Sequence, residues 1–286
     1  MTLVRQISVA VLIAMIGLGA WRGWVSSNAR HDAPTAGSEA VRSVSGLASS
    51  ASEPAALPVA GAGQAHPIER VQATAAAAPP ADLRAVLTDL FGRQAVQTLL
   101  QTDDFPRRLV ATVDNLGRER APAGLWPVVP APGAFAVSSP RTDGPADELA
   151  IDADNALRYI PFVLMVESVD LRRVAALYAQ AYPVFQQAYE DLGYPGRYFN
   201  DRLVEVIDLL LATPDLSGPV RVHLPAIHGP IRPERPWVLY EFDDPALEGL
   251  SAGQKMLLRM GPVNERRLKT RLIEFRRLVA SEGVPR

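Results

Sequence analysis

The sequence predicts a mainly α protein: a single helical domain of about seven or eight helices with a small β-ribbon, placed after an N-terminal transmembrane anchor and a disordered linker. Three observations lead to this prediction. Apolar residues recur at helical spacing through most of residues 81–286, the expected globular domain. Residues 26–80 are rich in Ala, Ser, Pro and Gly, with almost no aromatic residues. Residues 1–25 contain an apolar run flanked by Arg and Trp.

The first 25 residues are expected to form an uncleaved membrane anchor. Residues 7–20 are apolar apart from Ser8 and the glycines. With Trp21 and Trp24 placed at the interface, residues 3–25 reach the roughly 17–25 residues that a spanning helix needs. A cleaved signal peptide is the alternative, although no convincing small-x-small cleavage site precedes the tryptophans. Charges flank the run on both sides, so the positive-inside rule does not decide its orientation.

Residues 26–80 are expected to be a disordered linker. A segment of this composition cannot bury enough apolar surface to offset the entropy of ordering it. As a coil it would span about 40 Å root-mean-square, which suits a domain held away from a bilayer. His31 and His66 lie in this segment, and the sequence assigns them no role.

Three amphipathic helices are expected within residues 82–116. Asp82 is the N-cap of the first, and Gly92 separates it from the second. Thr102, Asp103 and Asp104 offer N-caps for the third helix, whose first turn accommodates Pro106. The polar face of the third helix carries Arg107, Asp114 and Arg118, of which the last two lie four apart and are expected to pair.

Residues 119–150 contain many prolines and no helical pattern. A long segment without regular structure can mark a functional loop. The preferred interpretation is that Trp126, Val128 and Phe135 pin a crossing extended segment over the helices.

Two helices follow. The first is capped by Asp154 and Asn155, contains Arg158 and runs to about Glu167; the second is capped by Asp170 and ends at Gly193. Pro183 should kink the second helix or split it. Its aromatic ridge could line a cleft, but an amphipathic edge of the core is the preferred interpretation. The ridge consists of Tyr178, Tyr182 and Tyr189.

Asn200 is expected to cap the next helix, which ends at Pro214. Residues 220–224 and 237–242 alternate in polarity, which predicts a two-stranded ribbon. Asp244 and Pro245 then start a short helical turn.

The stretch 251–264 combines the clearest local signals of the chain. Ser251 and Gln254 form a capping box, and Gly261 with Pro262 ends one helix and starts the next. Lys255 and Arg259 lie four apart on a shared face. The last helix should run to about residue 280 with a buried stripe of Leu268, Leu272, Phe275 and Val279.

The charge of this end of the chain is unlike that of the rest. Residues 251–286 contain nine Lys or Arg and three Glu, a balance of +6, whereas the whole chain carries −2 and the first 250 residues therefore −8. Such an asymmetry indicates docking within the protein or an acidic partner. The simpler interpretation is a solvated, Arg-lined helix face.

Three stretches together resemble a known family. They are DDFPRRLVATVDNL at residues 103–116, LYAQAYPVFQQAYEDLGYP at 177–195 and QKMLLRMGPVN at 254–264, the last being the most specific. In order and spacing they are similar to the bacterial "domain of unknown function 3014" family, over about residues 82–280. The resemblance implies a proteobacterial membrane-anchored protein with a Pro/Ala-rich spacer. It implies no activity and no site.

The sequence lacks several catalytic and metal-binding signatures. There is no cysteine, which excludes disulfides, a thiol nucleophile and thiolate metal sites. His223 and His228 have no third His or Cys beside them, so no metal site is expected. No Gly-rich phosphate loop and no Gly-x-Ser-x-Gly motif occur, and no cofactor is expected. The overall acidity and the expected export argue against nucleic acid as a partner.

Two functions remain. The preferred hypothesis is a non-enzymatic interaction or binding module, held in the bacterial inner membrane by a single pass with its C-terminal domain in the periplasm. Its partner would be an acidic protein or a cell-wall component. The candidate binding or structural polar cluster comprises Asp103, Asp104, Arg107, Asp114, Arg158, Tyr182, Tyr189, Lys255, Arg259 and Asn264.

The alternative is a cell-wall-directed hydrolase that uses paired carboxylates, one of them with its pKa raised by burial so that it donates a proton. This hypothesis requires two carboxyl groups about 5–10 Å apart in an open groove. The candidates are Asp103, Asp104, Asp114 and Glu205.

Overall fold

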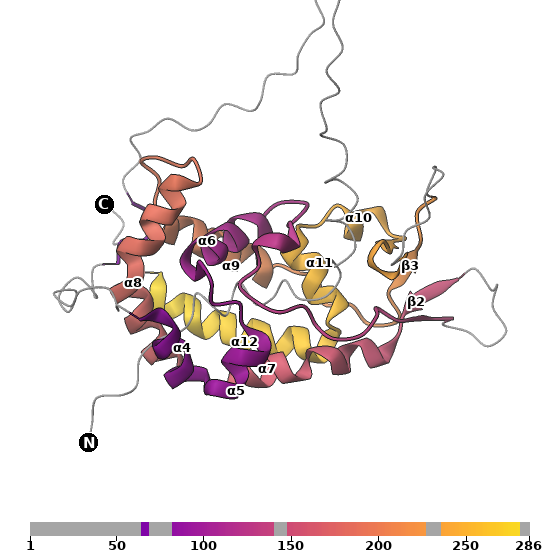
Figure 1. Ribbon diagram of the computed structural model, residues 1–286. Coiled ribbons are helices and arrows are strands. Elements are labelled where there is room, and N and C mark those ends of the chain that lie inside the picture. The colour runs from indigo at the N-terminus through magenta and orange to yellow at the C-terminus, as the bar shows by residue number, and fades with distance from the viewer. Residues whose placement is uncertain (1–63, 69–81, 140–147, 227–235, 281–286) are drawn as a thin grey trace, which may run out of the picture.

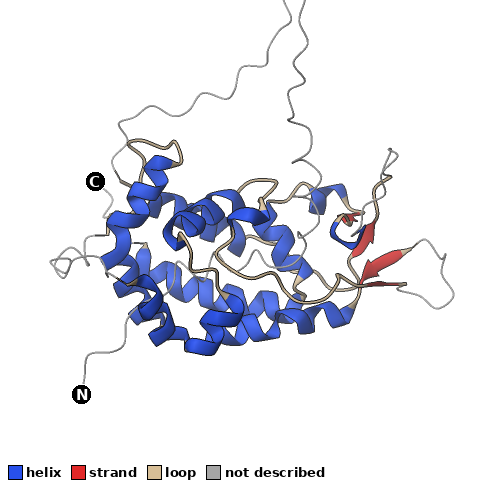
Figure 2. Cartoon of the chain, viewed as in Figure 1, coloured by secondary structure: helices blue, strands red, loops and turns tan. Residues whose placement is uncertain are grey.

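The computed structural model describes residues 64–68, 82–139, 148–226 and 236–280. Within these ranges the chain forms nine α-helices and a four-stranded antiparallel sheet, so the mainly helical fold is confirmed (Figures 1 and 2). The expected anchor, residues 1–25, and most of the expected linker lie outside the described residues. Among the described helices, none is long and apolar enough to cross a membrane.

The N-terminal helices begin largely as the sequence predicts. Helix α4 (Leu83–Phe91) is capped by the Asp82 side chain, which accepts a hydrogen bond from the Ala85 N–H. Gly92, at a φ of 81°, separates α4 from α5 (Arg93–Leu99). Helix α6 (Phe105–Leu116) differs from the prediction, because Asp104 occupies its N-cap position without a side-chain cap bond to the described backbone.

The next helices correct two predicted caps. A 3-10 helix, η3 (Ala153–Tyr159), is capped by Asp152 rather than by Asp154 and Asn155, and it leads into α7 (Ile160–Glu167). The Asn155 side chain is buried and instead bonds the backbone of Ala136.

Helix α8 (Leu171–Asp191) is capped by Asp170, as predicted, and continues through Pro183 without splitting. Of the two predicted effects of Pro183, a kink or a split, the split does not occur. A proline removes one backbone hydrogen bond, and the burial of Tyr178 and Phe185 on either side holds the helix against the core.

Helix α9 (Phe199–Leu211) begins one residue before Asn200, so Asn200 is not its N-cap. The Gln186 side chain on α8 accepts a hydrogen bond from the Phe199 N–H at 2.9 Å. A neighbouring helix thus satisfies an N–H of the first turn, and the Asn200 side chain is used elsewhere.

The C-terminal helices confirm the clearest sequence signals. Helix α10 (Pro245–Glu248) is followed by α11 (Ala252–Arg259), where both hydrogen bonds of the Ser251–Gln254 capping box are present. Gly261, at a φ of 84°, precedes α12 (Pro262–Val279). The predicted stripe of α12 is buried: Leu268, Leu272, Phe275 and Val279.

Helix α12 lies at the centre of the helical part and packs against α7, α8, α9 and α11 (Figure 1). Phe275 meets Tyr178 edge-on at a ring separation of 6.4 Å, and Tyr178 stacks on Phe185. Tyr178 and Tyr189 are both 3% exposed, so the aromatic ridge belongs to the core, as preferred from the sequence.

A small sheet lies at one end of the helices (Figure 2). Its strands are β1 (Val137–Ser138), β2 (Leu149–Ile151), β3 (Arg221–His223) and β4 (Glu241–Phe242), in that order and all antiparallel. The predicted ribbon corresponds to β3 and β4, but the second predicted strand, residues 237–242, is shorter than expected, because its start lies in a 3-10 helix over residues 236–238. The other two strands come from the extended segment, whose predicted pins are indeed buried: Trp126, Val128 and Phe135.

Residues 64–68 differ from the expected linker, because they contact the helical domain. Ile68 packs against the main core. Two short 3-10 helices, η2 (Ala123–Leu125) and η4 (Pro236–Val238), complete the described elements.

The close approach of α11 to α6 depends on Gly253. A Cβ built there would lie 2.5 Å from Leu210 Cδ2 and 3.1 Å from the Leu116 carbonyl oxygen. We expect Gly253→Ala to lower the free energy of unfolding by about 1–3 kcal/mol, because overpacking outweighs the gain in helix propensity. Urea unfolding measures this change.

The matched control is Gly124→Ala. A Cβ at Gly124 would have no described atom within 4 Å. Its substitution should change the unfolding free energy by less than about 1 kcal/mol. Equal effects of the two substitutions would contradict the close-approach argument.

Candidate functional site

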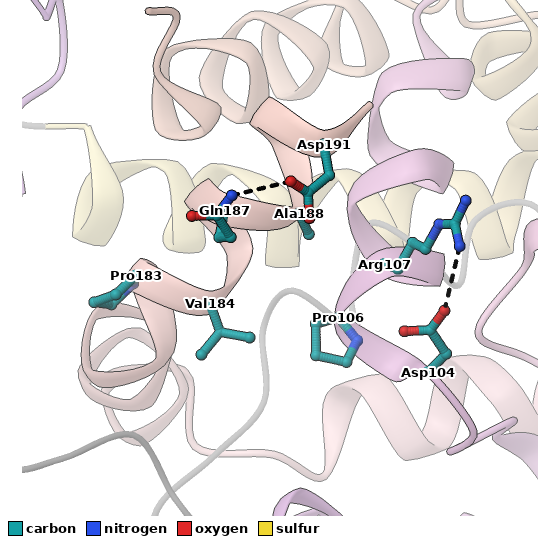
Figure 3. A pocket seen from close by; sticks show the side chains of 8 residues that line it. All are labelled: Asp104, Pro106, Arg107, Pro183, Val184, Gln187, Ala188 and Asp191. Atoms are coloured by element: carbon teal, nitrogen blue, oxygen red, sulfur yellow. Dashed lines mark hydrogen bonds and ion pairs between the residues drawn. The ribbon is translucent and has the colours of Figure 1, made fainter. Parts of the chain in front are cut away.

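An open cleft of about 640 Å³ lies between the start of α6 and the middle and end of α8 (Figure 3). Helix α6 contributes its first turn, and α8 contributes the face that follows its internal proline. The cleft therefore combines rigid apolar groups with carboxylate, amide and guanidinium groups. Its lining residues are Asp104, Pro106, Arg107, Pro183, Val184, Gln187, Ala188 and Asp191.

Asp104 is the conformationally unusual residue of the cleft. Its φ of 51° and ψ of 38° place it in the left-handed region, and it is the one non-glycine residue with positive φ among the described residues. Its carboxylate lies 4.0 Å from Arg107 Nη1, with both side chains more than half exposed. An exposed pair of this kind stabilises a fold very little. Asp104 therefore combines backbone strain with little compensating side-chain stabilisation.

The α8 wall of the cleft was not identified from the sequence. Gln187 Nε2 donates to Asp191 Oδ1 at 3.0 Å, and Val184 is 38% exposed beside Pro183 (Figure 3). The signal that could have identified this wall is the proline inside α8, followed by polar groups four residues apart at Gln187 and Asp191.

Asp114, a candidate from the sequence, belongs to a separate internal network. Its side chain is 8% exposed and accepts from Arg118 at 2.6 Å, as predicted, and from Arg202 Nε at 3.1 Å. Tyr194 donates to the same carboxylate at 3.1 Å and stacks on Tyr189 at 4.6 Å. Burial raises the pKa of Tyr189 to about 12. This network joins α6 to α9 and to the turn after α8.

Lys255 does not face solvent. It is 7% exposed, and its Nζ donates to Glu248 Oε1 at 2.8 Å and to the Glu248 carbonyl oxygen at 2.9 Å. An acidic partner of Lys255 is thus supplied by α10 of the same chain.

Arg259 also points into the domain. Its guanidinium lies 4.7 Å from the centre of the Phe242 ring and donates to the Tyr240 carbonyl oxygen at 3.0 Å. Burial lowers the pKa of Arg259. Arg259 therefore contacts β4 and the residue before it.

The remaining candidates hold local structure. Arg158 donates to the carbonyl oxygens of Pro132 and Gly133, which fixes the extended segment against η3. Asn264 bonds the Ala156 carbonyl oxygen at 2.8 Å. Tyr182 donates to Gln186 at 2.9 Å, and burial raises the pKa of Tyr182 to about 12.

Several cations of the basic C-terminal end pair with acids of the same chain. Lys269 Nζ lies 2.7 Å from Glu265 and 3.0 Å from Asp215. Arg267 and Arg276 pair with acids on other helices, Glu167 on α7 and Asp208 on α9. Of the three sequence-based explanations for the charge asymmetry, docking within the protein accounts for these side chains.

Of the four carboxylates of the hydrolase alternative, Asp104 alone lines the cleft. Asp114 is held in its ion network, and Glu205, 67% exposed, pairs with Arg202 at 2.9 Å. The part of the chain that the structure describes also contains no group of three or more His, Cys, Asp or Glu side chains arranged to hold a metal ion.

The fold and its sites define a class of protein: a helical domain with a small antiparallel sheet, whose candidate polar residues divide between internal networks and an open cleft. Residues 105–276 match the family described as "Protein of unknown function (DUF3014)". The match covers more than half of the chain, so the chain belongs to this family and the resemblance of its three stretches is confirmed. Comparisons with curated proteins and with solved structures gave no match.

Replacing Arg259 should weaken the link between α11 and the sheet. We expect Arg259→Glu to lower the free energy of unfolding by about 3 kcal/mol, because it loses the ring contact and the hydrogen bond and places a carboxylate near Glu248 and Glu241. Arg266 is an exposed residue of α12, and Arg266→Glu should change stability by less than about 0.5 kcal/mol. Equal melting temperatures of the two variants would contradict the assigned role of Arg259.

Glu265 provides a test that depends on pH. Burial raises its folded-state pKa above the ordinary value of 4.5 despite the nearby Lys269. Above pH 4.5 the folded state therefore binds more protons than the unfolded state, and stability falls as pH rises through the folded pKa. Glu265→Gln should remove this decline, so that the variant gains stability relative to the parent between about pH 4 and 7.

Urea unfolding at several pH values measures this difference. Glu274, exposed on the same helix, is the control site, and Glu274→Gln should change stability by less than about 0.5 kcal/mol. If the difference in unfolding free energy between Glu265→Gln and the parent is constant over this pH range, the folded-state pKa of Glu265 is not raised.

Proposed function

We propose that this protein is a membrane-anchored, periplasm-facing interaction module without catalytic activity, and that it binds a partner protein in the α6–α8 cleft. Residues 1–25 would anchor it in the bacterial inner membrane by a single pass. The Ala/Pro-rich segment that follows would hold the domain at a distance from the bilayer. The order of anchor, spacer and domain supports this arrangement.

The cleft is the observation that carries the proposal. It is open, it lies between two of the helices that contain family-like stretches, and it presents Asp104 in a strained backbone conformation. Strain of about 1 kcal/mol persists where surrounding structure enforces it, and such residues concentrate at functional sites. The Asp104 side chain, with its one ion pair exposed, is available to a ligand.

The charges of the cleft indicate the chemistry of the partner. Two carboxylates, Asp104 and Asp191, stand against one guanidinium, Arg107. Carboxylates accept hydrogen bonds and bind cations, so the cleft suits a protein segment that presents Lys or Arg beside an apolar residue, which would pack on Val184. An acidic partner at the basic end is less suitable, because acids of the same chain already pair with those cations.

Photocrosslinking in cells tests the proposal. A photoreactive amino acid introduced at Val184, 38% exposed, should capture a discrete partner protein, identified by mass spectrometry. The same amino acid at Ile273, 41% exposed on α12, is the matched control and should not capture it. The crosslink at Val184 should fall by about tenfold in Asp104→Asn, which removes one ionic contact of roughly 1.5 kcal/mol.

Equal capture at both positions would contradict binding in the cleft. Co-purification of wall fragments in place of a protein would favour a cell-wall ligand. Asp104→Gly serves as a check on folding. It should raise the unfolding free energy by about 0.5–1 kcal/mol, because glycine adopts the left-handed conformation without strain. The crosslink from Val184 should nevertheless be lost in this variant.

A further inference from the structure

Residues 64–68, which we call the linker strap, lie against the first turn of α9. Both carboxylate oxygens of Asp201 accept hydrogen bonds from the strap. Oδ1 accepts from the His66 N–H at 2.8 Å and Oδ2 accepts from the Ala65 N–H at 3.0 Å. Two successive backbone N–H groups thus converge on a single carboxylate, an arrangement that binds anions well.

Asn200 makes a third hydrogen bond to the strap, from the interior of the domain. Its side chain is fully buried, and Nδ2 donates to the His66 carbonyl oxygen at 2.8 Å and to the Val279 carbonyl oxygen at 3.0 Å. Its Oδ1 accepts from the Tyr178 hydroxyl at 3.0 Å. The side chain is therefore fixed by α8 and α12, and it directs one donor at the strap. A buried amide held in this way is pre-organised for its ligand.

The contacts of Asn200 and Asp201 recognise backbone rather than side chains. Both N–H groups and the carbonyl oxygen belong to the main chain. The strap bends at Ala65 and His66, which lets two successive N–H groups meet one carboxylate, so any segment that bends in this way offers the same groups. Pro67 contributes no N–H of its own. Ile68 then packs against the main core, which provides selectivity for an apolar side chain.

We propose that the first turn of α9 is a binding site for bent peptide segments of a partner protein, and that the linker strap occupies this site in cis. The ligand is a bend with two consecutive N–H groups and a carbonyl directed at α9, followed by proline and a branched aliphatic residue. The inference rests on the proposed function for the existence of a partner, but the site shares no residue with the α6–α8 cleft. The strap is a tethered competitor. It therefore reduces the apparent affinity for an incoming segment in proportion to the fraction of time that the site is free.

Peptide exchange on the full-length protein in detergent micelles tests the site. The probe is a fluorescein-labelled synthetic peptide with the sequence of residues 61–70, followed by fluorescence anisotropy. The variant Ala65→Pro, His66→Pro removes both strap N–H donors but leaves α9 unchanged. We expect it to bind the peptide at least about tenfold more tightly than the parent does, as for a strap bound about nine-tenths of the time.

Asp201→Asn, added to the proline variant, should lose this affinity again by about tenfold, because the amide cannot accept from both N–H groups. The matched control, Asp154→Asn, changes an exposed carboxylate on η3 and should leave affinity unchanged. Hydrogen exchange gives an independent readout: the amides of Ala65 and His66 should be protected in the parent and lose protection in Asp201→Asn.

Two results would overturn the proposal. If the proline variant binds the peptide no more tightly than the parent, the strap does not block a site. If Asp201→Asn has no effect on affinity or on amide protection, the contacts do not hold the peptide. Crosslinking from Val184 in the same variants reports on the cleft separately, so failure of one proposal is distinguishable from failure of the other.

Discussion

Burial of the apolar stripe of α12 is the constraint on which the rest of the domain depends. Leu268, Leu272 and Phe275 are fully buried, and each of α7, α8, α9 and α11 packs on this helix. Helix α12 is also strongly basic, so its burial brings cations against the surrounding helices. The acids that meet them come from α7, α9 and the loop after α9. The charge asymmetry of the sequence therefore reflects the packing of a basic helix against neighbouring segments that supply acids.

The local signals of the sequence predicted elements whose causes are local. The capping box at Ser251, the helix break at Gly261 with its positive φ and the stripe of α12 depend on residues within a few positions of one another, and all three are present. The pair of Asp114 and Arg118 follows from helical spacing in the same way. These features could be predicted because the physics that produces them does not require the tertiary structure.

Features created by tertiary contacts could not be predicted in this way. Asn200 has the residue type of a cap, but Gln186 from another helix takes the Phe199 N–H and frees Asn200 for the strap. From the sequence, Lys255 is expected at the surface, but in the structure Glu248 on α10 pairs with it. The strands β1 and β2 are too short to show alternation, and they exist because β3 pairs with β2. The α8 wall of the cleft requires knowing that α6 begins opposite Pro183.

Helix α8 relates the two proposed sites to each other. Tyr178, Tyr182 and Gln186 recur every four residues and point toward the first turn of α9, where they fix Asn200 and Phe199. Pro183 and Gln187 are offset by one residue from this row, and they line the cleft on another face of the same helix. Because α8 lines the cleft and also positions the first turn of α9, it fixes the separation of the two sites. A partner that engages both sites must therefore present a basic group and a bent segment at one defined spacing, and simultaneous binding would raise its affinity without a new contact.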